Sequence, residues 1–146
     1  MIVVICVTDY ALVQYAHTHL GVGMSTGLKV TGFSTSAASY KIVTDTDSDE
    51  NAETDVTGST GKIYSIDISN GGGTHTSYTK FKLSSGVVTP GTTEPDLLLL
   101  AKPNTAKQYV FPAGLDFDQL SFWTTRNGET SDTTAPNTTI VTILCS

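Results

Sequence analysis

Carboxylates are densest in one segment of this chain, where Asp45, Asp47 and Asp49 alternate with polar residues. The three occupy positions 1, 3 and 5 of an EF-hand-type loop, in which side-chain oxygens bind Ca2+. The match then fails, because Glu50 stands where that loop needs glycine and Val56 where it needs a bidentate glutamate. The segment is therefore either a solvated, mobile surface loop, which we expect, or a weak calcium site at Asp45, Asp47 and Asp49.

Histidines give a weaker signal for a transition metal. His17 and His19 are two residues apart and would share one face of a strand. Asp9 is the nearest further ligand, and its spacing is not that of a metal site. His75 lies in a glycine-flanked turn. We expect ordinary surface or partly buried histidines and no metal.

One pair of carboxylates is spaced as in a hydrolase. Asp116 and Asp118 flank Phe117 and would share a strand face, as paired carboxylates do at a glycosidase centre. An exposed strand end explains the same alternation. The sequence contains no nucleophile elbow, phosphate loop or zinc motif. We therefore expect no catalytic residues, no cofactor and no enzyme activity.

Aromatic side chains could stack against sugar rings. The candidates for such a platform are Tyr64, Tyr78, Tyr109, Phe122 and Trp123. Most of them alternate with polar residues along predicted strands, which favours packing in a core. Trp123 lies on the face opposite Leu120 and Phe122, so it could instead meet a ligand or a neighbouring subunit.

Composition points to a hydroxyl-rich β-domain. Charged residues make up 15% of the 146 residues, against about 25% in typical soluble domains. Counting along the sequence gives 25 threonines and 14 serines, and threonine favours strands. Low charge is also typical of a subunit that its neighbours cover. The length predicts a single domain over residues 1–146.

Several partner classes are disfavoured by charge and hydropathy. The net charge is −6, and no basic stripe exists that could neutralise phosphates, so we expect no nucleic-acid partner. No apolar run approaches 18 residues, so we expect no membrane span. The apolar run 2–7 lacks a basic segment before it and reads as a first strand rather than a secretion signal.

Two cysteines, Cys6 and Cys145, lie near opposite ends of the chain. A disulfide between them would require the first and last strands to be neighbours. We expect reduced thiols, because a chain without a secretion signal usually keeps them so, and the disulfide stays open as the alternative.

The elements that position these residues are marked by turns. A Thr-Thr-x-Pro turn occurs at 92–95 and again at 133–136, and each opens onto a strand-like run. Proline fixes its own backbone and extends the residue before it, so neither turn can continue a helix. Alternation and turn residues together predict nine strands, at 2–7, 28–33, 40–44, 62–69, 77–83, 97–101, 107–111, 119–125 and 138–145.

These runs predict an all-β, antiparallel β-sandwich of eight or nine short strands, jelly-roll-like in arrangement. We expect 62–69 and 77–83 to form a hairpin about the glycines at 71–73. In the first of these strands Tyr64, Ile66 and Ile68 should share the buried face. A turn at 111–114 should end the strand before it.

From Gly61 to Leu144 the sequence resembles small β-rich structural proteins of tailed bacteriophage virions, most of all capsid decoration (cement) proteins. The resemblance lies in the segments 61–70 (GKIYSIDISN), 78–82 (YTKFK), 91–97 (GTTEPDL), 109–115 (YVFPAGL), 120–123 (LSFW) and 132–136 (DTTAP). It covers a little over half of the chain.

The resemblance implies a non-enzymatic subunit that binds the major capsid protein or other virion proteins and stabilises the capsid shell. It also implies location in the virion and assembly as a homotrimer. Residues 1–20 lie outside the resemblance, but their apolar residues suggest an arm or edge strand that contacts the shell or a sister subunit. The alternatives are a phage tail, fibre or vertex protein, or a calcium-assisted carbohydrate-binding module.

Overall fold

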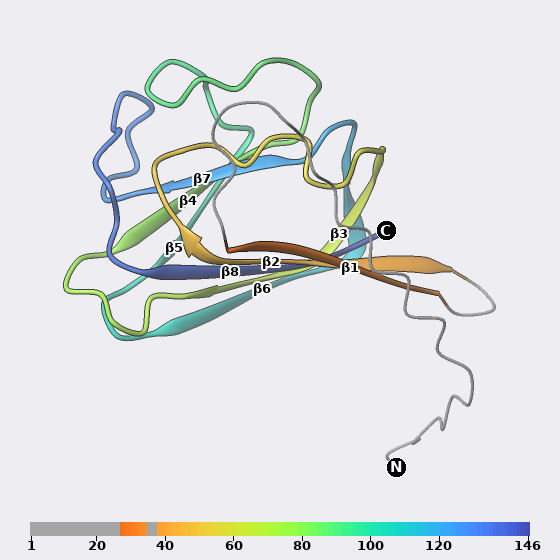
Figure 1. The fold of residues 1–146 in the computed structure, drawn as a ribbon, viewed down its shortest axis with the longest axis horizontal. Coiled ribbons are helices and arrows are strands. Elements are labelled where there is room, and N and C mark those ends of the chain that lie inside the picture. Colours follow the sequence, from red (N-terminus) through yellow and green to blue (C-terminus); the bar gives the residue numbers. More distant parts are fainter. Residues whose placement is uncertain (1–26, 35–37) are drawn as a thin grey trace, which may run out of the picture.

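Eight antiparallel strands form two stacked sheets in the computed structural model, which describes residues 27–34 and 38–146 (Figure 1). The strands are β1 (Leu28–Ser34), β2 (Ser39–Ser48), β3 (Gly61–Ser69), β4 (Ser77–Lys82), β5 (Leu97–Ala101), β6 (Ala106–Phe117), β7 (Ser121–Thr125) and β8 (Thr139–Cys145). The predicted all-β antiparallel sandwich is confirmed. The described residues contain no helix that could cross a membrane. The predicted strand 2–7, the arm 1–20, Cys6, His17 and His19 lie outside the described residues.

Sheet A is five-stranded, in the order β1-β2-β8-β3-β6, and sheet B is three-stranded, in the order β5-β4-β7. Both Thr-Thr-x-Pro turns lead into strands as predicted, into β5 and β8. The core lies between the sheets. It consists of Val43, Val56, Ile63, Ile66, Ile68, Phe81, Leu99, Ala101, Phe117, Leu120, Phe122, Val141, Ile143 and Cys145.

The predicted hairpin of 62–69 and 77–83 is wrong. Strand β3 pairs with β6 and β8 in sheet A, whereas β4 pairs with β5 and β7 in sheet B. The buried Asn70 explains why the chain crosses between the layers here. Its backbone accepts from Asn104 N and donates to Thr105 O, and its Nδ2 donates to the carbonyl oxygens of His75 and Ala101. The glycine-rich link is thus tied to the 102–105 link and cannot fold back on β3.

A large bulge separates β3 from β6 and reverses one predicted orientation. Ile63 lies opposite Leu115 and Ser65 opposite Val110, so Tyr64 alone faces the four residues 111–114. Ile63, rather than Tyr64, therefore joins Ile66 and Ile68 in the core. The predicted turn at 111–114 does not end the strand, because Gly114 at φ 75° lets β6 bulge and continue to Phe117.

Hydroxyl groups join the two layers inside the core. Ser48 and Thr139 of sheet A meet Thr124 and Ser77 of sheet B, with oxygen–oxygen distances of 2.9 Å for Ser48–Thr124 and 2.7 Å for Ser77–Thr139. Thr79 adds a third contact, at 3.1 Å from the Thr124 hydroxyl. All five residues are buried. Because each hydroxyl has a partner, these polar groups are accommodated in the core.

We expect Thr124→Val to lower the free energy of unfolding by about 1–3 kcal/mol, because it leaves the buried hydroxyls of Ser48 and Thr79 each short of a partner. Urea unfolding at low protein concentration measures this. Thr142→Val is the matched control, since Thr142 is half-buried on the outward face of sheet A, and it should stay within about 0.5 kcal/mol of wild type. Equal effects of the two substitutions would contradict a structural role for the hydroxyl contacts.

Candidate functional site

The acidic segment does not form the expected solvated loop. Strand β2 continues through Asp45, which is 1% exposed, to Ser48. The chain then runs along the edge of sheet B, where Thr124 N donates to Asp49 O at 2.7 Å and Glu53 exchanges two backbone hydrogen bonds with Phe122. The segment therefore connects the two sheets and covers the edge of β7.

The structure does not gather Asp45, Asp47 and Asp49 at one place. Asp45 is buried and Asp47 is exposed, because the pairing of β2 with β8 is irregular between Asp45 and Ser48. Asp49 binds Asn51 through both carboxylate oxygens. Within the described ranges, no group of three or more His, Cys, Asp or Glu side chains could hold a metal ion.

Asp116 and Asp118 line a shallow surface hollow of about 310 Å³, together with Leu83, Ser84, Asp96 and Phe117. Both carboxylates are exposed, and Asp116 forms an ion pair with Lys62 at 2.6 Å. The arrangement matches an exposed strand end rather than an enclosed pair of acids.

Cys145 is fully buried in β8, and burial raises the pKa of its thiol to about 11, although the charge of Lys41 works in the opposite direction. Such a thiol is almost entirely protonated near neutral pH and is therefore a poor nucleophile. Its candidate disulfide partner, Cys6, lies outside the described residues.

A loop that holds a buried ammonium covers part of the outward face of sheet B, where Leu98 and Leu100 of β5 stay exposed. Lys80 of β4 points away from the core yet is fully buried. Its Nζ donates to Glu129 O at 2.5 Å and to Asp132 O at 3.4 Å, both in the loop after β7. Burial lowers the pKa of Lys80, and the Asp132 and Glu129 carboxylates oppose that shift.

Asp132 also shapes this loop from within. Its carboxylate accepts from the backbone nitrogens of Asn127, at 2.7 Å, and Thr134, at 3.1 Å. Burial alone would raise the pKa of Asp132, but hydrogen bonds from Thr134 and Asn127, with the charge of Lys80, hold it below its usual value. The carboxylate therefore stays ionised while it orders the turn beside Lys80.

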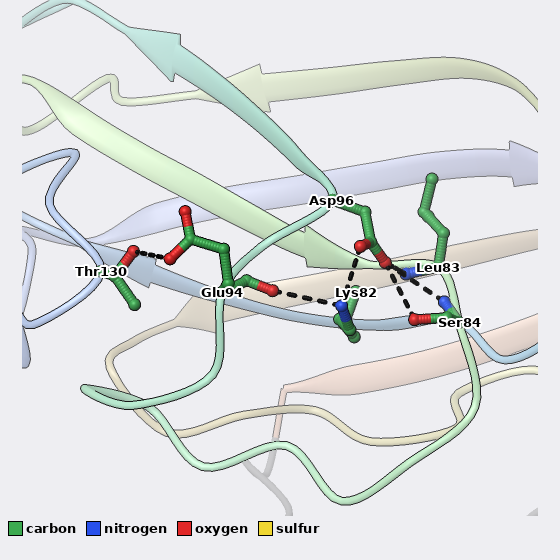
Figure 2. A network of polar contacts seen from close by, with 6 residues as sticks. All are labelled: Lys82, Leu83, Ser84, Glu94, Asp96 and Thr130. Carbon is green, nitrogen blue, oxygen red and sulfur yellow. Dashed lines mark hydrogen bonds and ion pairs between the residues drawn. The ribbon is translucent and has the colours of Figure 1, made fainter.

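A second loop, 84–96, lies beside the first, and Figure 2 shows how it is fastened. Asp96 forms an ion pair with Lys82 at 2.8 Å, and its other oxygen accepts from Leu83 N and from the backbone and hydroxyl of Ser84. Burial alone would raise the pKa of Asp96, but these hydrogen bonds and the charge of Lys82 hold it below its usual value. Glu94 extends the network, since its carboxylate accepts from the Thr130 hydroxyl at 2.7 Å.

The two Thr-Thr-x-Pro turns meet above sheet B. Gly91, at φ 86°, follows Pro90 in a tight turn closed by Thr92 N donating to Thr89 O. A side chain at Gly91 would reach to 2.9 Å from Thr133 Cγ2, so glycine also allows the close approach of the two loops. We call the two loops, 84–96 and 126–136, the roof of sheet B.

The roof and the core account for most of the predicted aromatic platform. Phe122 faces the core, and Trp123 is fully buried on the outward face beside Lys80, so packing is confirmed for both. Tyr78 lies against Gly128. The Tyr109 hydroxyl accepts from Leu100 N and donates to Leu100 O, which shields part of the β5 edge.

Because Trp123 is the only tryptophan, its fluorescence reports directly on the roof. We expect a blue-shifted emission that acrylamide quenches weakly, and no change in emission when glycans are added. Emission like that of free tryptophan, strongly quenched in the native protein, would contradict burial under the roof and would favour a sugar platform.

The lowered pKa of Lys80 should appear in the pH dependence of stability. Between that lowered pKa and the ordinary value of 10.5, Lys80 holds more protons in the unfolded chain than in the folded chain, so its contribution to the free energy of unfolding rises with pH. Lys80→Met should lack this rise, and Lys107→Met, at an exposed position, is the matched control. Urea unfolding of all three proteins from about pH 8 to about pH 11 tests it. A constant difference between wild type and Lys80→Met over this range would refute the assignment.

Sheet A presents a different outward face, which no other strand or loop of the described chain covers (Figure 1). Two rows of directly paired residues cross all five strands on this side. We define them as the open face: Lys29, Thr44, Thr142, Asp67 and Gln108 in the first row, and Thr31, Ile42, Leu144, Ser65 and Val110 in the second. None of the ten is buried, and Val110 is 60% exposed.

Three aromatic rings adjoin the open face at one end. Phe33 stacks on Tyr40 with ring centroids 5.5 Å apart, and Tyr40 meets Tyr64 edge-on at 5.7 Å. Tyr64 reaches this side because of the bulge in β3. The sequence did not single out Phe33 or Tyr40, although their positions opposite each other follow once the β1–β2 hairpin is known.

The open face and Lys80 were the features that sequence reasoning missed. Lys80 and Phe81 are neighbours in β4 and point to opposite faces, but no local sequence signal indicates that a loop returns to cover Lys80. No protein-family model, no curated protein and no solved structure matches this chain.

Proposed function

We propose that this chain is a non-enzymatic structural protein of a phage virion, a capsid decoration subunit that binds the major capsid protein or its neighbours and stabilises the shell. The resemblance of the segments between Gly61 and Leu144 supports the class of protein. The open face supports the mode of action, which is association with other protein.

The contrast between the two outward faces carries the proposal. Loops of the chain cover Lys80 and Trp123 on the outward side of sheet B, although Leu98 and Leu100 of β5 stay exposed there. Among the described residues, no strand or loop covers the outward side of the larger sheet A. Only two of the ten open-face residues, Lys29 and Asp67, carry a charge. Depletion of charge and exposed aliphatic side chains such as Ile42 and Val110 are typical of a surface that protein covers.

A subunit of this kind stabilises a shell by mass action. It binds assembled capsid proteins and not dissociated ones, so each bound copy raises the free energy needed to open the lattice. No residue needs to react, and the described part of the chain needs only rigidity and a complementary surface.

The test is to measure the copies of this chain in purified particles by quantitative mass spectrometry. A decoration subunit predicts copies on the order of hundreds per particle, because it follows the repeated lattice. Roughly a dozen copies or fewer would favour the tail, fibre or vertex alternative, and absence from particles would refute the proposal.

Substitution on the open face sharpens the test. We expect Val110→Asp to reduce occupancy of the particles by about tenfold, because a carboxylate placed in a dry interface loses its hydration. Val87→Asp is the matched control, since Val87 is 91% exposed in the roof. Equal occupancy of the two variants would show that the open face is not a contact in the particle.

A further inference from the structure

The open face is complementary to itself. Its first row has a cation at one end, on β1, and an anion three strands away, on β3. Its second row places Ile42 and Leu144 on the two strands between these ends. We propose that the first partner of the open face is a second copy of this chain, packed face to face about a two-fold axis.

The axis that fits runs parallel to the strands, above the line between β2 and β8. A half-turn about it places β1 over β3 of the second copy and β2 over β8 of the second copy. Lys29 then faces Asp67 of the second copy, and the same pair recurs by symmetry. Ile42 faces Leu144 of the second copy in the adjoining row.

The other positions on β1, β2, β8 and β3 are also matched, whereas β6, with Gln108 and Val110, lies beyond the overlap and faces no strand of the second copy. Thr44 faces Thr142 of the second copy, which puts hydroxyl against hydroxyl. Thr31 faces Ser65 of the second copy in the same way. Sheets packed face to face lie about 10 Å apart at an angle of about 30°, a gap that lysine and aspartate side chains can span from opposite sides.

Moving the axis by half a strand spacing destroys the match. With the axis above β8, Lys29 would face Gln108 of the second copy and Asp67 would face Thr44 of the second copy, so no charge would be paired. The charges do not satisfy each other within one chain, because three strand spacings of about 4.8 Å separate Lys29 from Asp67. In the single chain Asp67 accepts instead from Gln108 Nε2, at 3.4 Å.

The size of the face predicts a weak association. Four overlapping strands about 4.8 Å apart and about seven residues long give a flat footprint of about 440 Å², below the about 800 Å² per partner of a typical stable complex. We therefore expect a dimer that forms in the micromolar range and is strengthened when a capsid lattice concentrates the chains.

The inference rests on the proposed function only in taking the open face to be covered by protein, and it is tested without particles. Sedimentation velocity on the full chain, from about 5 to about 500 µM, should show a rise from 15.4 kDa toward twice that mass. Lys29→Asp and Asp67→Lys should each weaken association by about tenfold or more, because each leaves two like-charged pairs across the axis.

The decisive experiment is to measure association in an equimolar mixture of these two variants. One variant carries Asp at both positions and the other carries Lys at both, so the mixed dimer regains two opposite pairs and should associate like wild type. No rearrangement within one chain can produce that recovery. Val87→Asp, in the roof, should associate as wild type does.

A wild-type chain that stays monomeric at the highest concentration overturns the inference. A trimer of about 46 kDa, the state that the resemblance to decoration proteins implies, overturns it as well. So does a mixture that fails to recover. If circular dichroism shows that Asp67→Lys does not fold, Ile42→Asp takes its place, and its association must then fall below that of Val87→Asp. A dimer in solution without any copies in particles would refute the proposed function and leave the inference standing.

Discussion

The buried ammonium of Lys80 fixes the position of the loop that lies on the outward side of sheet B. Lys80 stands on the outward side of the smaller sheet, fully removed from water, and its ammonium is satisfied by backbone carbonyls of the loop that follows β7. An ammonium without such partners would be too costly to bury. The loop must therefore lie on the sheet, and in doing so it covers Trp123 and draws the second Thr-Thr-x-Pro turn against the first. The chain itself thus covers the outward side of sheet B around Lys80 and Trp123, whereas Leu98 and Leu100 of β5 stay exposed.

The outward side of sheet A is not covered by the described loops. The hydroxyl side chains of this sheet have different roles on its inward and outward sides. Facing the core, Ser48 and Thr139 bind hydroxyls of sheet B and join the layers. Facing outward, Thr44 and Thr142 form a neutral, β-branched surface between Lys29 and Asp67. The same residue type thus supplies internal polar contacts in one place and an uncharged docking surface in the other.

The sequence predicted the elements better than their partners. Alternation and proline-containing turns are local signals, and they located the strands that became β3, β4, β5, β7 and β8 to within a few residues. The hairpin of β3 with β4 failed because the deciding contacts of Asn70 are with Asn104 and Thr105, some 34 residues away along the chain. The orientation of Tyr64 failed because the bulge depends on four residues of β6.

The same distinction between local and long-range contacts explains which candidate sites were predicted correctly. Asp116 and Asp118 are exposed, as expected for an ordinary strand end rather than a carboxylate pair. That expectation succeeded because the surroundings of these two residues are set by their neighbours in sequence. The acidic segment was misjudged because its backbone pairs with Phe122 and Thr124, far along the chain. The open face could not be predicted at all, since its rows exist only once the order β1-β2-β8-β3-β6 is known.

The central claim is that the roof lies over sheet B, whereas sheet A is the face that other protein covers. Hydroxyl-radical footprinting tests this claim most directly, on the free chain at low concentration and on the chain in purified particles. The account predicts that labelling of Ile42, Val110 and Leu144 falls in the particle, whereas labelling of Val87 in the roof stays as it is in the free chain. Protection of Val87 with undiminished labelling of Val110 would contradict the account, because the roof and not sheet A would then be the covered face.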